Sequence, residues 1–176
     1  MLCSECKWVV LLLGSGLMCV AGDAGGKWTK HEQTNKMTDR VTVSFELYAD
    51  GAGHGSGPMV AILCSQGPDG KLPVAGAMYY GDDVLNGARH SPGDPREVKA
   101  EVRIDKESAY TALWRQPGRY ESAEMDDRTA KALLSATTLL IRVPTFPEGS
   151  AESSFTLTGL DLAQVTAACG PEPFGK

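Results

Sequence analysis

A glycine-rich stretch, GAGHGSG at residues 51–57, is the first part of this 176-residue sequence that invites a chemical interpretation. A phosphate-binding loop of this kind would be followed by a helix and would end in Lys with Ser or Thr. Here Pro58 and an apolar, strand-like run follow instead, so the stretch is expected to connect two strands of a hairpin. Ser56 resembles the nucleophile of a G-x-S-x-G motif, but it lacks the strand-to-helix turn that exposes such a serine.

All three histidines lie in polar segments: His31, His54 and His90. None is spaced from a second His, Cys or carboxylate as in a metal-binding motif such as H-x-x-x-H. The aspartates that could join them lie in loops (Asp82, Asp83 and Asp94), and the GDD stretch lacks the rest of a calcium loop. We therefore expect no metal site, no cofactor and no catalytic residue.

The first two dozen residues have the layout of a secretory signal. They carry one basic residue, Lys7, then an apolar run from Trp8 to Val20, then small residues. The cleavage rule favours a cut before Gly22, with a cut before Asp23 close behind. This division predicts a signal peptide at residues 1–21 and one β-rich domain at residues 22–176. Lipid attachment at Cys19 is disfavoured because Met18, which precedes it, is not small.

Signal cleavage would remove Cys3, Cys6 and Cys19 and leave two cysteines, Cys64 and Cys169. An even count in an exported protein predicts a disulfide, here one that closes a loop of about 105 residues. Two buried free thiols are the alternative, and a zinc site is poorer still because no further ligand has the right spacing.

The remaining chemical candidates share a predicted strand or follow it. Arg103 and Asp105 lie two residues apart on the polar side of residues 96–105, and Trp114 lies in the next predicted strand. Arg and Trp are common anchors of protein interfaces, so the three residues form a candidate partner-binding face. The structural alternative pairs Arg103 and Asp105 across strands and places Trp114 in the core.

Alternating apolar and polar residues predict the strands that must position these groups. The expected strands cover 27–30, 40–50, 59–64, 74–80, 96–105, 110–116, 138–144 and 153–159, and the expected helices cover 124–136 and 161–169. In the last helix, Asp161 would cap the first turn, and Leu162, Val165 and Cys169 would share one stripe. The strands follow one another mostly as hairpins, which favours an antiparallel β-sandwich-like domain with two short helices.

The net charge and the distribution of apolar residues argue against two classes of function. The formal charge of −5 argues against nucleic-acid binding, which needs a basic face. The body of the chain after residue 21 contains no apolar stretch of the length that spans a bilayer. The expected product is a soluble periplasmic or secreted protein.

Several of these motifs together resemble a known family. Trp28, DRVTVSFEL, PMVAILC, VRID, Trp114, LLIRV, FTLTGL and a final AAC occur in order between Trp28 and Cys169. The pattern is similar to that of the small periplasmic proteins associated with bacterial type VI secretion, of the TagO/VasI type. The resemblance implies a periplasmic accessory protein without catalysis and a disulfide between the Cys64 and Cys169 positions. The long glycine-rich loop and the ending CGPEPFGK depart from the pattern.

These observations predict a non-enzymatic protein that binds a protein or an envelope component. A secreted inhibitor or immunity-type protein that presents loops such as residues 81–94 is one alternative. A cell-wall-active hydrolase is another, and it would need His54 or His90 to meet a carboxylate in a cleft. The sequence leaves the partner and the oligomeric state open.

Overall fold

A computed structural model describes residues 27–52, 56–66, 73–88, 95–117 and 119–175. The predicted signal peptide, His54, His90 and Asp94 lie outside these residues. The described elements are β1 (Thr29–Asn35), β2 (Arg40–Tyr48), β3 (Met59–Gln66), β4 (Pro73–Tyr80), β5 (Arg96–Ile104), β6 (Tyr110–Gln116), β7 (Ser122–Glu124), α1 (Asp127–Ser135), β8 (Thr138–Thr145), β9 (Gly149–Thr156) and α2 (Leu162–Cys169).

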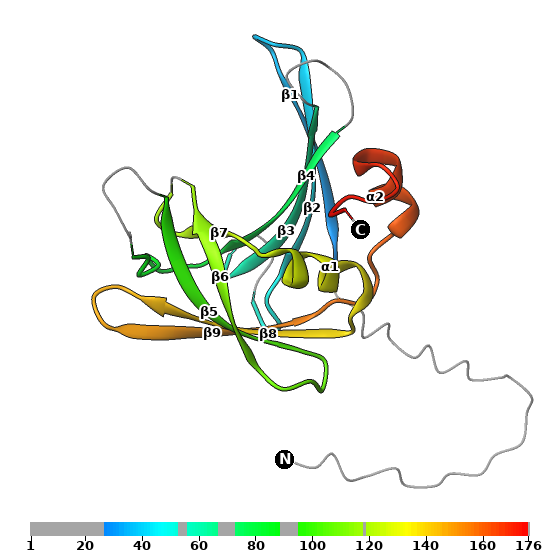
Figure 1. Cartoon of the computed structure of the whole chain (residues 1–176). Helices are drawn as coiled ribbons and strands as arrows, with labels where there is room; N and C mark the ends of the chain where they lie inside the picture. Colours follow the sequence, from blue (N-terminus) through cyan, green and yellow to red (C-terminus); the bar gives the residue numbers. More distant parts are fainter. Residues whose placement is uncertain (1–26, 53–55, 67–72, 89–94, 118, 176) are drawn as a thin grey trace, which may run out of the picture.

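The strands form one antiparallel sheet in the order β1-β2-β3-β4-β7-β6-β5-β8-β9. Figure 1 shows this sheet strongly curled, with β1–β4 on one side, β5, β8 and β9 crossing near their lower end, and α1 inside the curl. The mainly β, antiparallel fold with two helices is as the sequence predicts. Its two layers are two halves of one continuous sheet.

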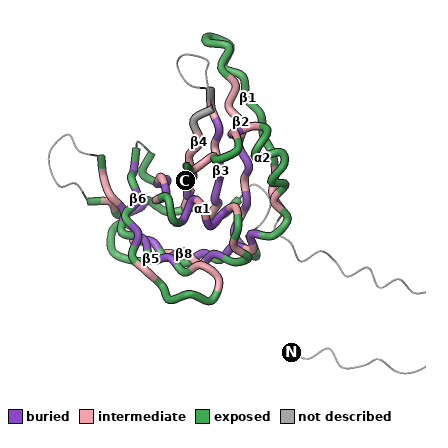
Figure 2. Tube along the Cα trace, turned by 45° about the vertical axis from the view of Figure 1, so that its right-hand side comes forward, coloured by how far each residue is buried: buried purple, intermediate pink, exposed green. Residues whose placement is uncertain are grey.

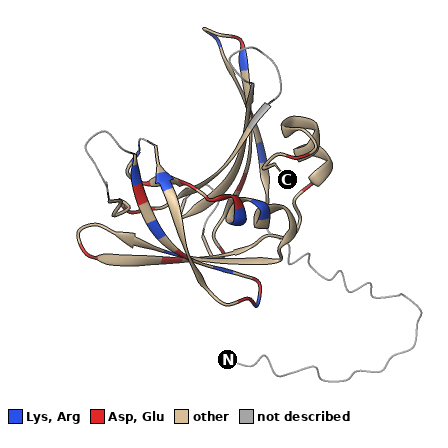
Figure 3. Ribbon diagram, viewed as in Figure 1, with Lys and Arg blue, Asp and Glu red and all other residues tan. Residues whose placement is uncertain are grey.

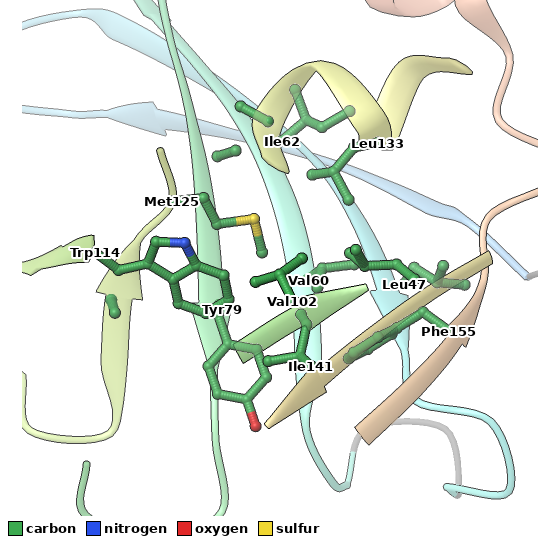
Figure 4. Close-up of a cluster of buried hydrophobic side chains, with 14 of the residues drawn as sticks. Leu47, Val60, Ile62, Tyr79, Val102, Trp114, Met125, Leu133, Ile141 and Phe155 are labelled. Atoms are coloured by element: carbon green, nitrogen blue, oxygen red, sulfur yellow. The ribbon is translucent and has the colours of Figure 1, made fainter. Parts of the chain in front are cut away.

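Period-two alternation explains how the strands fill the inside of the curl. On β5, Val98, Ala100 and Val102 are completely buried, while Lys99, Glu101 and Arg103 between them are exposed. The same alternation on β2, β3, β4, β8 and β9 brings apolar residues to a single core (Figure 2, Figure 4). The register Phe45↔Ile62 confirms the predicted hairpin of β2 and β3.

The curl closes at the C-terminal end of β9 through two polar links. The backbone N–H of Asp50, just after β2, donates to the carbonyl of Ser154 (2.8 Å). The Asp50 carboxylate accepts from the backbone N–H of Thr156 (3.0 Å) and from the Ser154 hydroxyl (3.2 Å). The indole N–H of Trp28 donates to the carbonyl of Leu157 (3.0 Å). Trp28, just before the edge strand β1, is thereby joined to Leu157, just after the other edge strand, β9. Asp50, just after β2, is joined to β9 itself.

Helix α2 begins with the predicted cap. The Asp161 carboxylate accepts from the backbone N–H groups of Ala163 (3.0 Å) and Gln164 (3.1 Å), which have no partner within the helix. The helix packs on β3 and β4 through Val165 and Cys169. Leu162, the first residue of the predicted stripe, is 50% exposed, so only Val165 and Cys169 of that stripe are buried.

Cys169 meets Cys64 of β3 where α2 packs on the sheet. The two sulfur atoms lie at disulfide-bonding distance, with a Cα–Cα separation of 5.1 Å. This is the pair that the sequence predicts, and it ties the last helix to a central strand 105 residues away.

The connection from β4 to β5, expected to be a polar loop, is partly built into the sheet. Leu85 bridges to Thr145 of β8, and Ala88 exchanges two backbone hydrogen bonds with Glu97 of β5. Leu85 is 1% exposed. Gly87 lies between these two residues, where a Cβ atom would stand 2.7 Å from Oε1 of Gln116 and 3.1 Å from Cβ of Arg96, so a side chain there would require its neighbours to shift.

Candidate functional site

The outward sides of β5, β8 and β9 form a polar surface opposite the core. Cross-strand register places the residues in two rows: Glu101, Arg142 and Glu152 in one row, and Arg103, Leu140 and Ser154 in the next. These six residues are called the β5–β8–β9 face below. Figure 3 shows charges of both signs along β5 where it borders this surface.

Arg142 ties the three strands together across the first row. Its guanidinium lies 2.9 Å from the carboxylate of Glu101 and 2.8 Å from that of Glu152. The hydrogen bond to Glu152 is the largest of the interactions that raise the pKa of Arg142. All three side chains are about half exposed, so the triad fixes side-chain positions more than it adds stability.

Arg103 in the second row differs from Arg142. It is exposed, and no hydrogen bond or ion pair joins its guanidinium to the described residues. A hollow of about 190 Å³ on one side of it is lined by residues of the first row, with Leu140 and Ala109. A second hollow, of about 200 Å³, lies on the other side and reaches Asp50, Thr138 and Ser154. Arg103 therefore borders two hollows with its guanidinium available.

Asp105 does not pair with Arg103, contrary to the structural alternative raised from the sequence. Its backbone adopts a left-handed conformation (φ 47°), and its carboxylate accepts from the backbone N–H groups of Thr138 (2.7 Å) and Thr137 (2.8 Å). These hydrogen bonds, the one from Thr138 first, lower the pKa of the Asp105 carboxyl. Asp105 thus fastens the end of β5 to the start of β8.

Trp114 lies on the inner side of the sheet and is 0% exposed, so it cannot touch a partner from the surface that carries Arg103. Its indole N–H donates to the Asp126 carboxylate (3.1 Å), and its ring lies 5.8 Å from that of Tyr79 (Figure 4). The structure therefore brings Arg103 and Asp105 to one surface and places Trp114 in the core, as the structural alternative expected.

A third hollow, of about 580 Å³, lies along the edge of β9 where the curl is open. It is lined by the turn around Asp50, by Ser56 to Pro58, by Asp82 and by Glu152 to Ser154. Beneath it, the Tyr79 hydroxyl meets that of Ser153 at 3.3 Å inside the core. Burial, more than any neighbouring charge, raises the pKa of Tyr79.

Those candidate catalytic and metal-binding residues that the structure describes lie far apart in the fold or are exposed without a common site. His31 lies on β1, 3.5 Å from the carboxylate of Glu46. Asp82 and Asp83 are exposed in the turn after β4, and Ser56 lies at the opening of the third hollow. Over the described ranges, no three His, Cys, Asp or Glu side chains are grouped to hold a metal ion.

Sequence reasoning missed Asp50, Arg142 and Glu152, which shape this surface. Arg142 and Glu152 each occupy an outward position of an alternating strand, which signals exposure. Their pairing depends on the register of β8 and β9, which alternation does not fix. Asp50 follows a strong strand, and nothing local indicates that its partners are more than one hundred residues away.

No helix in the described part of the chain is long and apolar enough to cross a membrane. Comparisons with protein-family models, with curated proteins and with solved structures each find no match to this chain.

Proposed function

We propose that this chain is an exported, non-enzymatic binding protein that contacts a protein or envelope component through the β5–β8–β9 face. The observation that carries this proposal is the Arg103 guanidinium, which lies between two hollows and has no ion-pair or hydrogen-bond partner among the described residues. The neighbouring Arg142 is held by two carboxylates, so Arg103 contrasts with it on the same surface.

The chemistry of Arg103 suits an anchor. A guanidinium presents planar donors that bind a carboxylate or phosphate in two-pronged fashion, and arginine is enriched among the residues that dominate binding energy. Leu140 beside it is half-buried and offers apolar contact. The Arg142 triad and the Asp105 hydrogen bonds hold the strands that carry these groups, which limits the ordering cost on binding.

Export is supported by the N-terminal sequence and by the cysteine pair. A disulfide between Cys64 and Cys169 is stable in an oxidising compartment, and a bacterial periplasm is such a compartment. The proposed role, from the resemblance to TagO/VasI-type proteins, is that of an envelope accessory to type VI secretion.

The binding test compares two charge reversals in the tagged, full-length chain. Arg103→Glu should abolish capture of the partner from a periplasmic extract, while Lys30→Glu, at an exposed cation of the far edge strand β1, should leave capture unchanged. Both variants should unfold at the wild-type temperature. Equal capture by the two variants would contradict the proposed surface.

The export test is the intact mass of the chain expressed with its own N-terminus. A mass that begins at Gly22, with no cysteine alkylated before reduction, is the expected result. A full-length mass with every cysteine alkylated would place the chain in a reducing compartment and contradict export.

A further inference from the structure

Strand β9 is one edge of the sheet, and half of this edge is uncovered by the described residues. The Ser154 carbonyl and the Thr156 N–H point away from β8, since both are bonded to Asp50. Because the direction of backbone groups repeats every second residue in an antiparallel strand, the N–H and C=O of Ser150 and Glu152 point the same way. Asp50 covers the C-terminal half of this edge, and the groups of Ser150 and Glu152 face the open part of the curl.

Apart from the charge of Glu152 and the cover that Asp50 gives its C-terminal half, the edge carries few of the features that usually protect an exposed strand. β9 contains no Lys and no Pro, and it pairs with β8 without a bulge over its whole length. The opposite edge strand, β1, carries Lys30, His31 and Glu32 on successive exposed positions. Glu152 also lines the hollow of about 580 Å³, and Ser150 lies two residues before it on the same edge, so there is room beside this part of β9 for another chain.

The charges that line this hollow indicate that a segment bound there would carry a positive charge. Its charged side chains are Asp50, Asp82 and Glu152, and no Lys or Arg is among its described lining residues. The Asp50 carboxylate is engaged with β9, and one oxygen of Glu152 accepts from Arg142. Asp82 is exposed at the mouth of the hollow, and a cation there would face Asp82 and the outer side of Glu152.

A second copy of this chain is a poor occupant. Antiparallel pairing of two β9 edges would bring Glu152 of each copy close to the other, and like charges on neighbouring strands are destabilising. An extended segment with a basic residue has the opposite property, since its main chain pairs with the edge and its side chain is attracted to the carboxylates.

We propose that the partner supplies an extended segment that adds as a strand to β9 at Ser150–Glu152 and places a Lys or Arg side chain beside Asp82 and Glu152. This deepens the proposed function, on which it rests, by naming the form in which the partner binds. Such strand addition gives affinity through main-chain hydrogen bonds and specificity through a side-chain pocket. The edge adjoins the β5–β8–β9 face through Glu152 and Ser154, so one partner can reach both.

The test uses two pools of blocked heptapeptides whose central residue is Lys or Glu and whose other positions are drawn from Val, Thr, Ile, Ser and Gln. Affinity selection on the oxidised protein should enrich the Lys pool at least tenfold over the Glu pool. The best peptide should shift the backbone NMR signals of Ser150 and Glu152, and a Pro at alternate positions of that peptide should abolish binding.

A matched pair of variants locates the cation. Asp82→Lys, and more weakly Asp82→Asn, should remove binding of the selected peptide, while Asp83→Lys, the adjacent exposed aspartate outside the hollow, should retain it. Enrichment of neither pool, preference for the Glu pool, or equal effects of Asp82→Lys and Asp83→Lys would overturn the inference.

The outcomes separate this inference from the proposed function. Partner capture that requires Arg103 but is unaffected by Asp82→Lys would overturn strand addition and leave the binding function in place. Peptide binding at β9 together with partner capture that does not require Arg103 would support strand addition and overturn binding through the β5–β8–β9 face.

Discussion

The carboxylate of Asp105 accepts a hydrogen bond from the backbone N–H of Thr138 at 2.7 Å, across the junction of β5 and β8. This contact determines whether the Asp105 carboxylate can pair with Arg103 on the same surface. Asp105 and Arg103 lie two residues apart with opposite charges, and an ion pair between them would neutralise both. Because the carboxylate is directed to the backbone of Thr137 and Thr138 instead, the Arg103 guanidinium at the surface is paired with no carboxylate in the described part of the chain.

The same contact predicts an acid-dependent loss of stability. The pKa of Asp105 is lowered in the folded state, so its contribution is present above its ordinary pKa, about 4, and is lost as the pH falls through the folded value. Asp105→Asn should therefore flatten the decline in urea midpoint below about pH 4. Asp83→Asn, in an exposed turn, is the control. A decline as steep in Asp105→Asn as in the wild type would contradict this role.

Reduction of the cysteine pair should destabilise the fold strongly. Cys64 and Cys169 close a loop of 105 residues, for which the chain-entropy model gives about 4–5 kcal/mol of unfolding free energy. Urea unfolding with and without reductant measures the difference. The double variant Cys64→Ala/Cys169→Ala should be as unstable as the reduced wild type and insensitive to reductant. An unchanged midpoint on reduction of the wild type would show that the bond is absent.

Trp114 should matter for stability and not for binding. Trp114→Ala removes a fully buried ring and should cost about 3–5 kcal/mol of unfolding free energy. Leu113→Ala, at the neighbouring residue that is 54% exposed, should change it by less than about 0.5 kcal/mol. The binding readout uses Trp114→Phe, which keeps an apolar ring in the core. At equal folded concentration this variant should capture the partner as the wild type does. Loss of capture would show that Trp114 contributes to binding as well as to stability.

A side chain at Gly87 should destabilise the fold, because its neighbours on β5 and β6 would have to shift. A Cβ atom there would stand 2.7 Å from Gln116 Oε1 and 3.1 Å from Arg96 Cβ. Gly87→Ala should cost about 1–3 kcal/mol by overpacking. Gly76→Ala in β4 is the matched control because nothing lies within 4 Å of its Cβ position. Equal thermal midpoints for the two variants would contradict the packing described here.

The sequence predicts most strands of this fold because each buries one side. The alternation at Val98, Ala100 and Val102 is as clear in the sequence as in the burial of β5. The sequence does not predict β7, because a strand of three residues shows no periodicity and its last residue, Glu124, begins the segment for which the sequence predicts a helix. The closing of the curl involves Asp50 and Trp28, whose partners are distant in the chain.

The candidate site was only partly predictable. Alternation places Arg103 on the outer side of β5, and this is correct. It does not reveal that Arg142 is paired while Arg103 has no partner among the described residues, since the pairing of Arg142 depends on register with Glu101 and Glu152. Trp114 was ambiguous because a tryptophan at an alternating position serves equally as a core residue or an interface anchor.

Site-specific photocrosslinking in cells shows directly whether a partner binds at the β5–β8–β9 face. A photoreactive phenylalanine analogue replaces Leu140, beside Arg103, or Met37, which is 92% exposed in the turn between β1 and β2. We expect a discrete adduct with one partner from position 140, lost on Arg103→Glu, and none from position 37. No adduct from position 140 in a folded, exported protein, or the same adduct from position 37 alone, would contradict binding at this face.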